Sequence, residues 1–259
     1  MTRLKSLYRS LGLLSTGGQT AICDDLAGRP SVLADCFAEA LSKNSKLTPI
    51  DQPFLPTNAE KTRQPIGLED RNDNRIYHRL LEGDGVIVPT STEDYSFKVI
   101  ARQVPPLREA GNDRPNSGRG GVDYVGIAGE SPVLGEIKLG GDQNPFYALI
   151  QLFAYLSEMA TESQVERARK YLFGDAQVIG PSPSFDLHIL LADFNDRGSK
   201  GRLISATKRL VTAFRDQLLV RHPSASARLG KVLCMKLATG LTTGVNSGRI
   251  ELCWLDTNP

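Results

Sequence analysis

The stretch GGVDYVGIAGESPVLGEIKLGG, residues 120–141, decides the fold. It holds two short apolar runs, residues 122–128 and 133–139. The Gly-Glu-Ser-Pro segment between them, residues 129–132, is typical of the turn in a β-hairpin. We therefore expect two neighbouring antiparallel strands here.

Strand geometry brings three charged side chains of this hairpin together. Successive side chains point to opposite faces of a strand, so Glu136 and Lys138 share one face while Ile137 turns into the core on the other. The hairpin then places Asp123, on the first strand, beside Glu136. Two carboxylates and an amine are thus expected on one small area of a sheet.

The flanking sequence predicts helices and strands on both sides of the hairpin. Residues 145–160 form the most apolar helix, and hydrophobic residues on most of its sides predict deep burial against a sheet. Further helices are expected at residues 31–41, 68–81, 161–171 and 204–219, and further strands at 95–104, 185–194, 232–237 and 249–255. The predicted fold class is α/β, with a central mixed sheet flanked by helices.

Prolines divide the chain into two parts. Pro49, Pro53 and Pro56 cannot continue a helix, so we expect a boundary near residue 60. Residues 1–60 are then a mostly helical N-terminal extension, and residues 61–259 contain the sheet followed by a C-terminal helix and hairpin.

The composition is that of an ordinary globular protein. With 259 residues, 40% of them hydrophobic and 23% charged, the chain is neither collagen nor coiled coil nor disordered throughout. No apolar run approaches the roughly 18 residues of a membrane-spanning helix, so no membrane partner is expected. The four cysteines show no CxxC spacing and the three histidines form no ligand pair, which favours a reducing, cytoplasmic location without a zinc site.

The paired carboxylates indicate a cation site. Two ionised carboxylates at close range repel each other, and a divalent cation between them relieves the repulsion; hard oxygen ligands favour Mg²⁺ or Mn²⁺. The ammonium of Lys138 can orient an attacking water or stabilise charge that develops on a phosphate. The combination predicts phosphodiester hydrolysis. A ladder of cross-strand salt bridges on a solvated face is the structural alternative.

With this hairpin and the helix after it, the chain resembles the PD-(D/E)xK nuclease superfamily over roughly residues 68–194. The resemblance implies a restriction-endonuclease-like αβββαβ core. It also implies that Asp123 and Glu136 are metal ligands, that the Ile137 carbonyl adds another, and that Lys138 is the catalytic lysine. Val122 stands where the family usually has a proline.

The helix after the hairpin carries Gln151 and Tyr155 on one face. They look like the QxxxY motif of exonuclease-like branches of the family, whose helix supports the site or contacts nucleic acid. An unpaired buried amide costs roughly 1–3 kcal/mol, so Gln151 needs a partner, unless it only marks the edge of the buried stripe. Many family members also have a catalytic Glu on the first core helix. Glu69 is the corresponding candidate, with Asp73 in reserve and a helix N-terminal role as the alternative.

Basic residues gather in the C-terminal part, although the net charge of the chain is only +2. Nine basic residues and one acid lie between residues 197 and 231, a balance suited to holding phosphates non-specifically or to a solvated helix face. The candidates for nucleic-acid contacts are Arg114 and Arg119, in a Gly-rich loop before the hairpin, Tyr155, and the basic residues Lys200, Arg202, Lys208 and Arg209.

The leading hypothesis is a Mg²⁺-dependent nuclease that hydrolyses phosphodiester bonds of DNA. The alternative is a nuclease-fold module without cleavage activity that binds nucleic acid or serves as an assembly component. A nucleotide-binding enzyme lacks support, because the sequence has neither a GxxxxGK[ST] loop nor a GxGxxG motif after a strand. The sequence is compatible with RNA as substrate and with a homo-oligomer.

Overall fold

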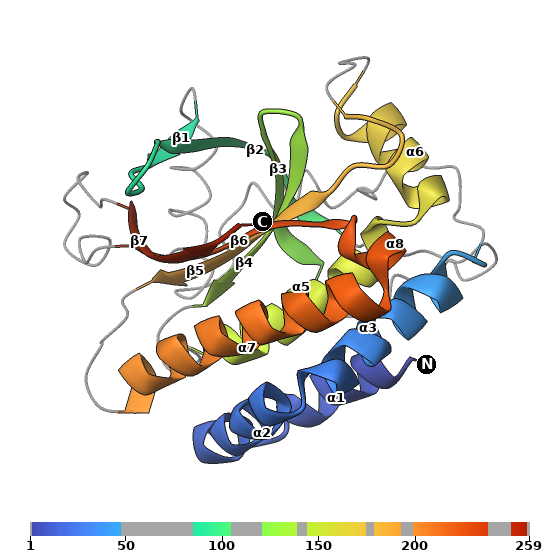
Figure 1. Ribbon diagram of the computed structural model, residues 1–259. Helices are drawn as coiled ribbons and strands as arrows, with labels where there is room; N and C mark the ends of the chain where they lie inside the picture. Colours follow the sequence, from blue (N-terminus) through green and yellow to red (C-terminus); the bar gives the residue numbers. More distant parts are fainter. Residues whose placement is uncertain are drawn as a thin grey trace.

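Seven strands form one mixed sheet whose spatial order follows the chain, from β1 to β7 (Figure 1). Neighbours from β1 to β4 are antiparallel, β4, β5 and β6 are parallel, and β7 is antiparallel to β6. The strands are β1 (Val86–Val88), β2 (Tyr95–Val104), β3 (Val122–Ala128), β4 (Ser131–Lys138), β5 (Phe185–Ala192), β6 (Leu229–Leu237) and β7 (Ile250–Asp256). The computed structural model describes residues 2–47, 85–104, 121–138, 144–174, 179–192, 199–237 and 250–257.

Helices connect the parallel strands and form a layer beside them. Parallel neighbours need crossover connections, and here α5 and α6 lie between β4 and β5 in the chain, while α7 and α8 lie between β5 and β6. The described helices are α1 (Arg3–Leu11), α2 (Thr16–Gly28), α3 (Pro30–Asn44), α5 (Pro145–Met159), α6 (Glu162–Tyr171), α7 (Ser199–Arg221) and α8 (Pro223–Ser226). None of the helices in these ranges is long and apolar enough to cross a membrane.

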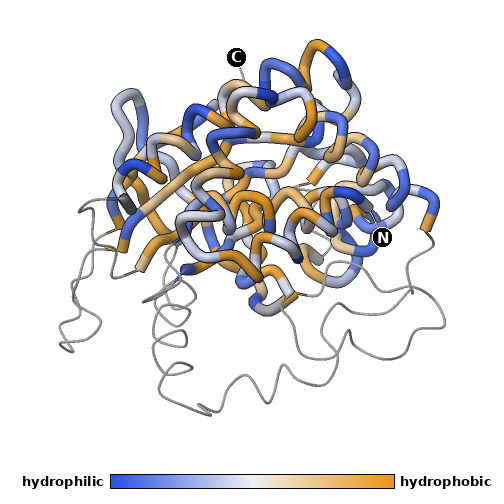
Figure 2. Tube along the Cα trace, turned by 90° about the horizontal axis from the view of Figure 1, so that it is seen from below, coloured by the Kyte–Doolittle hydropathy of each residue, from blue (hydrophilic) through white to orange (hydrophobic). Residues whose placement is uncertain are grey.

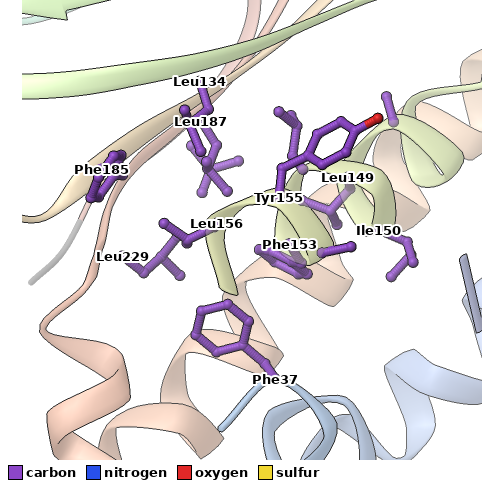
Figure 3. Close-up of a cluster of buried hydrophobic side chains, with 14 of the residues drawn as sticks. Phe37, Leu134, Leu149, Ile150, Phe153, Tyr155, Leu156, Phe185, Leu187 and Leu229 are labelled. Atoms are coloured by element: carbon purple, nitrogen blue, oxygen red, sulfur yellow. The ribbon is translucent and has the colours of Figure 1, made fainter. Parts of the chain in front are cut away.

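One hydrophobic core joins this helical layer to the sheet. Each described helix contributes residues to it, and strand residues such as Leu134 and Leu187 face them from the sheet (Figure 3). Phe37 of α3, Phe153 of α5 and Phe214 of α7 meet with ring centroids 4.5 to 6.0 Å apart. Each such pair adds about 0.5–1.5 kcal/mol beyond simple burial. The three N-terminal helices are therefore packed into the same core as α5 and the sheet.

Helix α5 is buried almost all round, as its sequence predicts. All of its residues except Tyr147 are buried, because the sheet covers one side and the other helices cover the rest. Its N-terminus is well defined: Pro145 stands in the first turn, and Asn144 Oδ1 accepts a hydrogen bond from the Tyr147 N–H at 3.1 Å. The first turn of α5 is therefore fixed beside the end of β4, where the site lies.

The opposite face of the sheet has a core made by the strands themselves. The sheet curls so strongly that its edge strands β1 and β7 approach each other (Figure 1). The described residues of this second core come from strands β1 to β6, and partly buried residues of β7 pack against them. Figure 2 shows hydrophobic segments mostly in the interior and hydrophilic ones mostly at the periphery. Two separate cores thus lie on the two faces of one sheet.

Most predicted elements are present, with some differences at their ends. The hairpin turn is shorter than expected, because Pro132 already lies in β4 opposite Ile127 and only Gly129 and Glu130 connect the strands. Helix α7 begins earlier than predicted, at Ser199, and β1 and α2 were not expected. Helix α2 has glycines at positions 17 and 18, which disfavour an isolated helix; burial of Cys23 and Leu26 in the core stabilises it.

The general fold class is confirmed as α/β with a mixed sheet flanked by helices. The helix expected at residues 68–81 and the boundary expected near residue 60 lie outside the described residues.

Gly135 gives a direct test of the packing between β3 and β4. A Cβ at this position would lie within the ring of Tyr124, which is fully buried and hydrogen-bonded to His188. We expect Gly135→Ala to lower the free energy of unfolding by about 1–3 kcal/mol or more, measured by urea denaturation.

Gly28→Ala is the matched control, because a Cβ there meets no atom within 4 Å. It should change the free energy of unfolding by less than about 1 kcal/mol. Equal effects of the two substitutions would contradict the described register of β3 and β4.

Candidate active site

The register of the first hairpin brings two carboxylates together. Tyr124 lies opposite Gly135, so the next residues along, Asp123 and Glu136, also face each other across the two strands. Asp123 Oδ2 accepts a hydrogen bond from the Ile137 N–H at 2.8 Å, which fixes this side chain at the end of β4. The side chain of Ile137 turns into the core of the curled face, as alternation along the strand predicts.

Lys138 links β4 to α5. Its ammonium donates to Glu136 Oε1 at 2.9 Å and to Gln151 Oε1 at 3.1 Å, and Gln151 Nε2 in turn donates to the Tyr155 hydroxyl at 3.2 Å. The buried amide of Gln151 therefore has the partners that its burial requires. The structure brings Asp123, Glu136, Lys138, Gln151 and Tyr155 into one network, and this excludes the alternative of a ladder on a solvated face.

The network is buried, and one of its charges is poorly balanced. Glu136 is 3% exposed and Lys138 is 6% exposed. Lys138 satisfies one carboxylate oxygen of Glu136, while the other, Oε2, is buried and has no hydrogen-bond partner among the described residues. Burial, and then the negative charge of Asp123, raise the pKa of Glu136 well above its usual range, and Lys138 opposes this only in part. The site therefore favours an added positive charge.

The residues present fit a hard divalent cation. Asp123 and Glu136 supply carboxylate oxygens, the ligands that Mg²⁺ and Mn²⁺ prefer, and the buried Oε2 of Glu136 needs either a proton or a cation. Across the described ranges no group of three or more His, Cys, Asp or Glu side chains gathers, so these two acids would need the Ile137 carbonyl, or water, to complete the shell. Small cations of this kind commonly keep several waters.

Two tyrosines that the sequence reasoning missed also belong to the site. The Lys138 ammonium lies 4.8 Å from the ring centroid of Tyr147, and the ring of Tyr8 stacks on Tyr147 at a centroid distance of 5.4 Å. Tyr8 comes from α1, so the N-terminal extension reaches the site. The sequence did contain a signal for this contact, because the spacing of Leu4, Tyr8 and Leu11 places them on one helix face. In the structure Leu4 and Leu11 are fully buried, so this face packs against the rest of the protein.

The residues predicted to contact nucleic acid differ in their exposure. Arg202, Lys208 and Arg209 are exposed on α7, and Lys200 lies in its first turn. Tyr155 is 6% exposed and supports Gln151 from within the network. Glu69, Arg114 and Arg119 lie outside the described residues.

Two basic residues of the same C-terminal stretch have structural partners. Arg215 is buried and donates to Asp256 at 2.5 Å and to the Gly230 carbonyl at 2.7 Å. Arg221 forms two hydrogen bonds with Asp35 of α3, each 3.0 Å long. The basic surface of α7 is therefore smaller than the count of charges in the sequence indicates.

A second polar cluster lies in the core of the curled face. The Tyr95 hydroxyl donates to Asp186 at 2.8 Å and lies 2.9 Å from His188 Nε2, while the Tyr124 hydroxyl lies 3.1 Å from His188 Nδ1. Burial lowers the pKa of His188 to about 3, so its imidazole is neutral near pH 7. All four side chains are buried and hydrogen-bonded, which indicates a structural role.

The unbalanced charge of Glu136 has a measurable consequence for stability. In a chelator, unfolded Glu136 titrates near pH 4.3, whereas the folded group holds its proton to higher pH. Its contribution to stability is therefore full below about pH 4.3 and is lost as pH rises through the folded pKa. We expect the free energy of unfolding of Glu136→Gln, relative to wild type, to rise between pH 4 and 8 by at most about 1.4 kcal/mol per pH unit.

Urea denaturation at several pH values, with and without Mn²⁺, checks this expectation. Mn²⁺ should raise the stability of wild type and have little effect on Glu136→Gln. A stability difference that stays constant with pH would show that Glu136 titrates normally.

No family model, curated protein or solved structure matches this chain.

Proposed function

We propose that this chain is a metal-dependent nuclease that hydrolyses phosphodiester bonds of DNA. The observation that carries the proposal is the convergence of Asp123, Glu136 and Lys138, with a buried carboxylate oxygen of Glu136 that lacks a partner within the part of the chain that the structure describes. A salt-bridge network with a purely structural role would be expected to satisfy that oxygen, because an unpaired buried acceptor is costly.

Each residue has a role that follows from its chemistry and position. Asp123 and Glu136 would hold Mg²⁺ or Mn²⁺, together with the Ile137 carbonyl. Such a cation, when bound, polarises a phosphoryl oxygen and makes water a better nucleophile. The Lys138 ammonium, held by Glu136 and Gln151, would orient the attacking water or stabilise negative charge on the phosphate. Gln151 and Tyr155 would keep Lys138 in place.

The order of elements supports a restriction-endonuclease-like core. Three antiparallel neighbours, β2, β3 and β4, are followed by the buried helix α5 and then by β5, which is parallel to β4. These elements follow one another as the resemblance implies, with β1 added before β2 and α6 added before β5. The first core helix and Glu69 would precede β2 in the chain, outside the described residues.

The order of elements in the chain supports a basic surface near the site. Because β4 and β5 are parallel, their C-terminal ends lie at one edge; Lys138 ends β4 there, and α7 begins after the end of β5. The first turns of α7 carry Lys200 and Arg202, and Lys208 and Arg209 follow. These residues would hold a nucleic-acid backbone through phosphate contacts that weaken as salt rises.

Cleavage assays test the proposal directly. Purified protein should cut DNA in Mg²⁺ or Mn²⁺ and lose this activity in chelator. Lys138→Ala and Asp123→Ala should each lower the cleavage rate at least about 100-fold, because each removes a group that acts at the phosphate or on the cation. Lys98→Ala, an exposed lysine on β2, is the matched control and should keep the wild-type rate.

The outcomes separate the competing functions. Full activity of both site variants would overturn the assignment of the site. If wild type binds DNA but cuts neither DNA nor RNA in any divalent cation, the chain is a binding or assembly module instead. Circular dichroism of each variant should match that of wild type, so that loss of activity does not reflect unfolding.

A further inference from the structure

Tyrosine rings from two helices gather beside the proposed catalytic lysine. The Lys138 ammonium lies over the ring of Tyr147, 4.8 Å from its centroid, and the ring of Tyr8 stacks on Tyr147 with a centroid separation of 5.4 Å and an interplanar angle of 24°. Tyr155 also lies 6.4 Å from Tyr8, with its ring tilted by 60°. Three aromatic rings from α1 and α5 are therefore gathered at one side of the carboxylate pair.

The position of Tyr8 is determined by several contacts of α1. Leu4 and Leu11 are fully buried on the same helix face. Lys5 donates to Glu158 of α5 at 2.8 Å. At the end of the helix Gly12 leaves room for the Tyr147 hydroxyl, which would lie 3.0 Å from a Cβ at that position. Tyr8 is therefore held as part of the wall of the site.

The two outer tyrosines differ in accessibility from the rest of the network. Glu136, Lys138, Gln151 and Tyr155 are buried, each less than 10% exposed, whereas Tyr8, Tyr147 and Asp123 are half-buried. Among the described members of the network, these half-buried residues are the ones that solvent, and so a substrate, can contact. Tyrosine rings at such a position offer a flat apolar surface with polar hydroxyl groups beside it.

We propose that Tyr8 is a substrate-binding residue, and that it stacks on a base of a single-stranded nucleic acid next to the phosphate at the Asp123, Glu136 and Lys138 site. The inference rests on the proposed nuclease function and names its substrate. Bases inside a duplex are stacked on their neighbours and present no free face, whereas an unpaired strand can place one base on an aromatic ring. Because the ring of Tyr8 stacks on Tyr147, which contacts the Lys138 ammonium, the stacked base would be a neighbour of the cleaved linkage.

Fluorescence of 2-aminopurine tests the stacking without any need for cleavage. Single-stranded oligonucleotides with 2-aminopurine at successive positions are titrated, in chelator, into protein with Asp123→Asn, which keeps an acceptor for the Ile137 N–H. Fluorescence should be quenched at one position. Adding Tyr8→Leu should abolish this quenching and weaken single-strand binding about tenfold, and duplex binding should not change. Tyr8→Phe should restore the quenching.

Tyr171→Leu is the matched control, because Tyr171 is also a half-buried tyrosine on a helix but lies outside the site. It should leave quenching and affinity unchanged. If Tyr8→Leu fails to fold, photocross-linking of 5-iododeoxyuridine oligonucleotides to the Asp123→Asn protein replaces it, with the modified residue found by mass spectrometry. A cross-link at Tyr8 supports the proposal, and cross-links only at other residues overturn it.

Failure of this inference is distinguishable from failure of the nuclease proposal. If wild type cuts DNA but the Asp123→Asn protein binds single strands equally well with and without Tyr8→Leu, only the role of Tyr8 is wrong. A wild-type protein that neither binds nor cuts nucleic acid would remove both.

Discussion

The arrangement depends on a buried ion pair. Lys138 and Glu136 are both almost completely removed from water, and burying two charges costs several kcal/mol for each ion unless partners replace the lost solvent. Helix α5 supplies those partners for Lys138 through Gln151 and the face of the Tyr147 ring. Glu136 receives less, since one of its oxygens accepts no hydrogen bond from the described ranges and Asp123 lies beside it. The negative charge of the two carboxylates is therefore only partly compensated, and a bound cation would compensate it.

The polar cluster on the other face of the sheet differs from the candidate site in how its charges are balanced. Asp186 receives hydrogen bonds from the Tyr95 hydroxyl and from the backbone of Lys231, and His188 lies between two tyrosine hydroxyls. A neutral imidazole in a closed core needs nothing further from outside. In the candidate active site, by contrast, the hydrogen-bond partners do not balance the charges of the two carboxylates. Half-buried residues also adjoin this site. Burial alone is common to both clusters, so it is charge balance and access that separate them.

Much of this was predictable from local sequence, because the period of two along a strand and the periodicity of a buried helix are local signals. They predict that Glu136 and Lys138 share a face, that Asp123 lies across from Glu136, and that α5 is buried; all three are confirmed. Tyr8 was missed because its contact with Tyr147 joins segments far apart in the sequence. No local sequence pattern indicates that α1 packs against α5. Helix α2 was missed for a related reason, since tertiary packing overrides the weak propensity of its glycines.

The distribution of the site along the chain has a consequence for biosynthesis. Tyr8 leaves the ribosome long before the hairpin that carries the acids, and that hairpin is completed on its other side only when β5 has been made and has paired with β4. Because domains fold as units during synthesis, the nascent chain holds separate fragments of the site for most of its elongation. The complete constellation of side chains would then be assembled late, after most of the polypeptide has emerged from the ribosome.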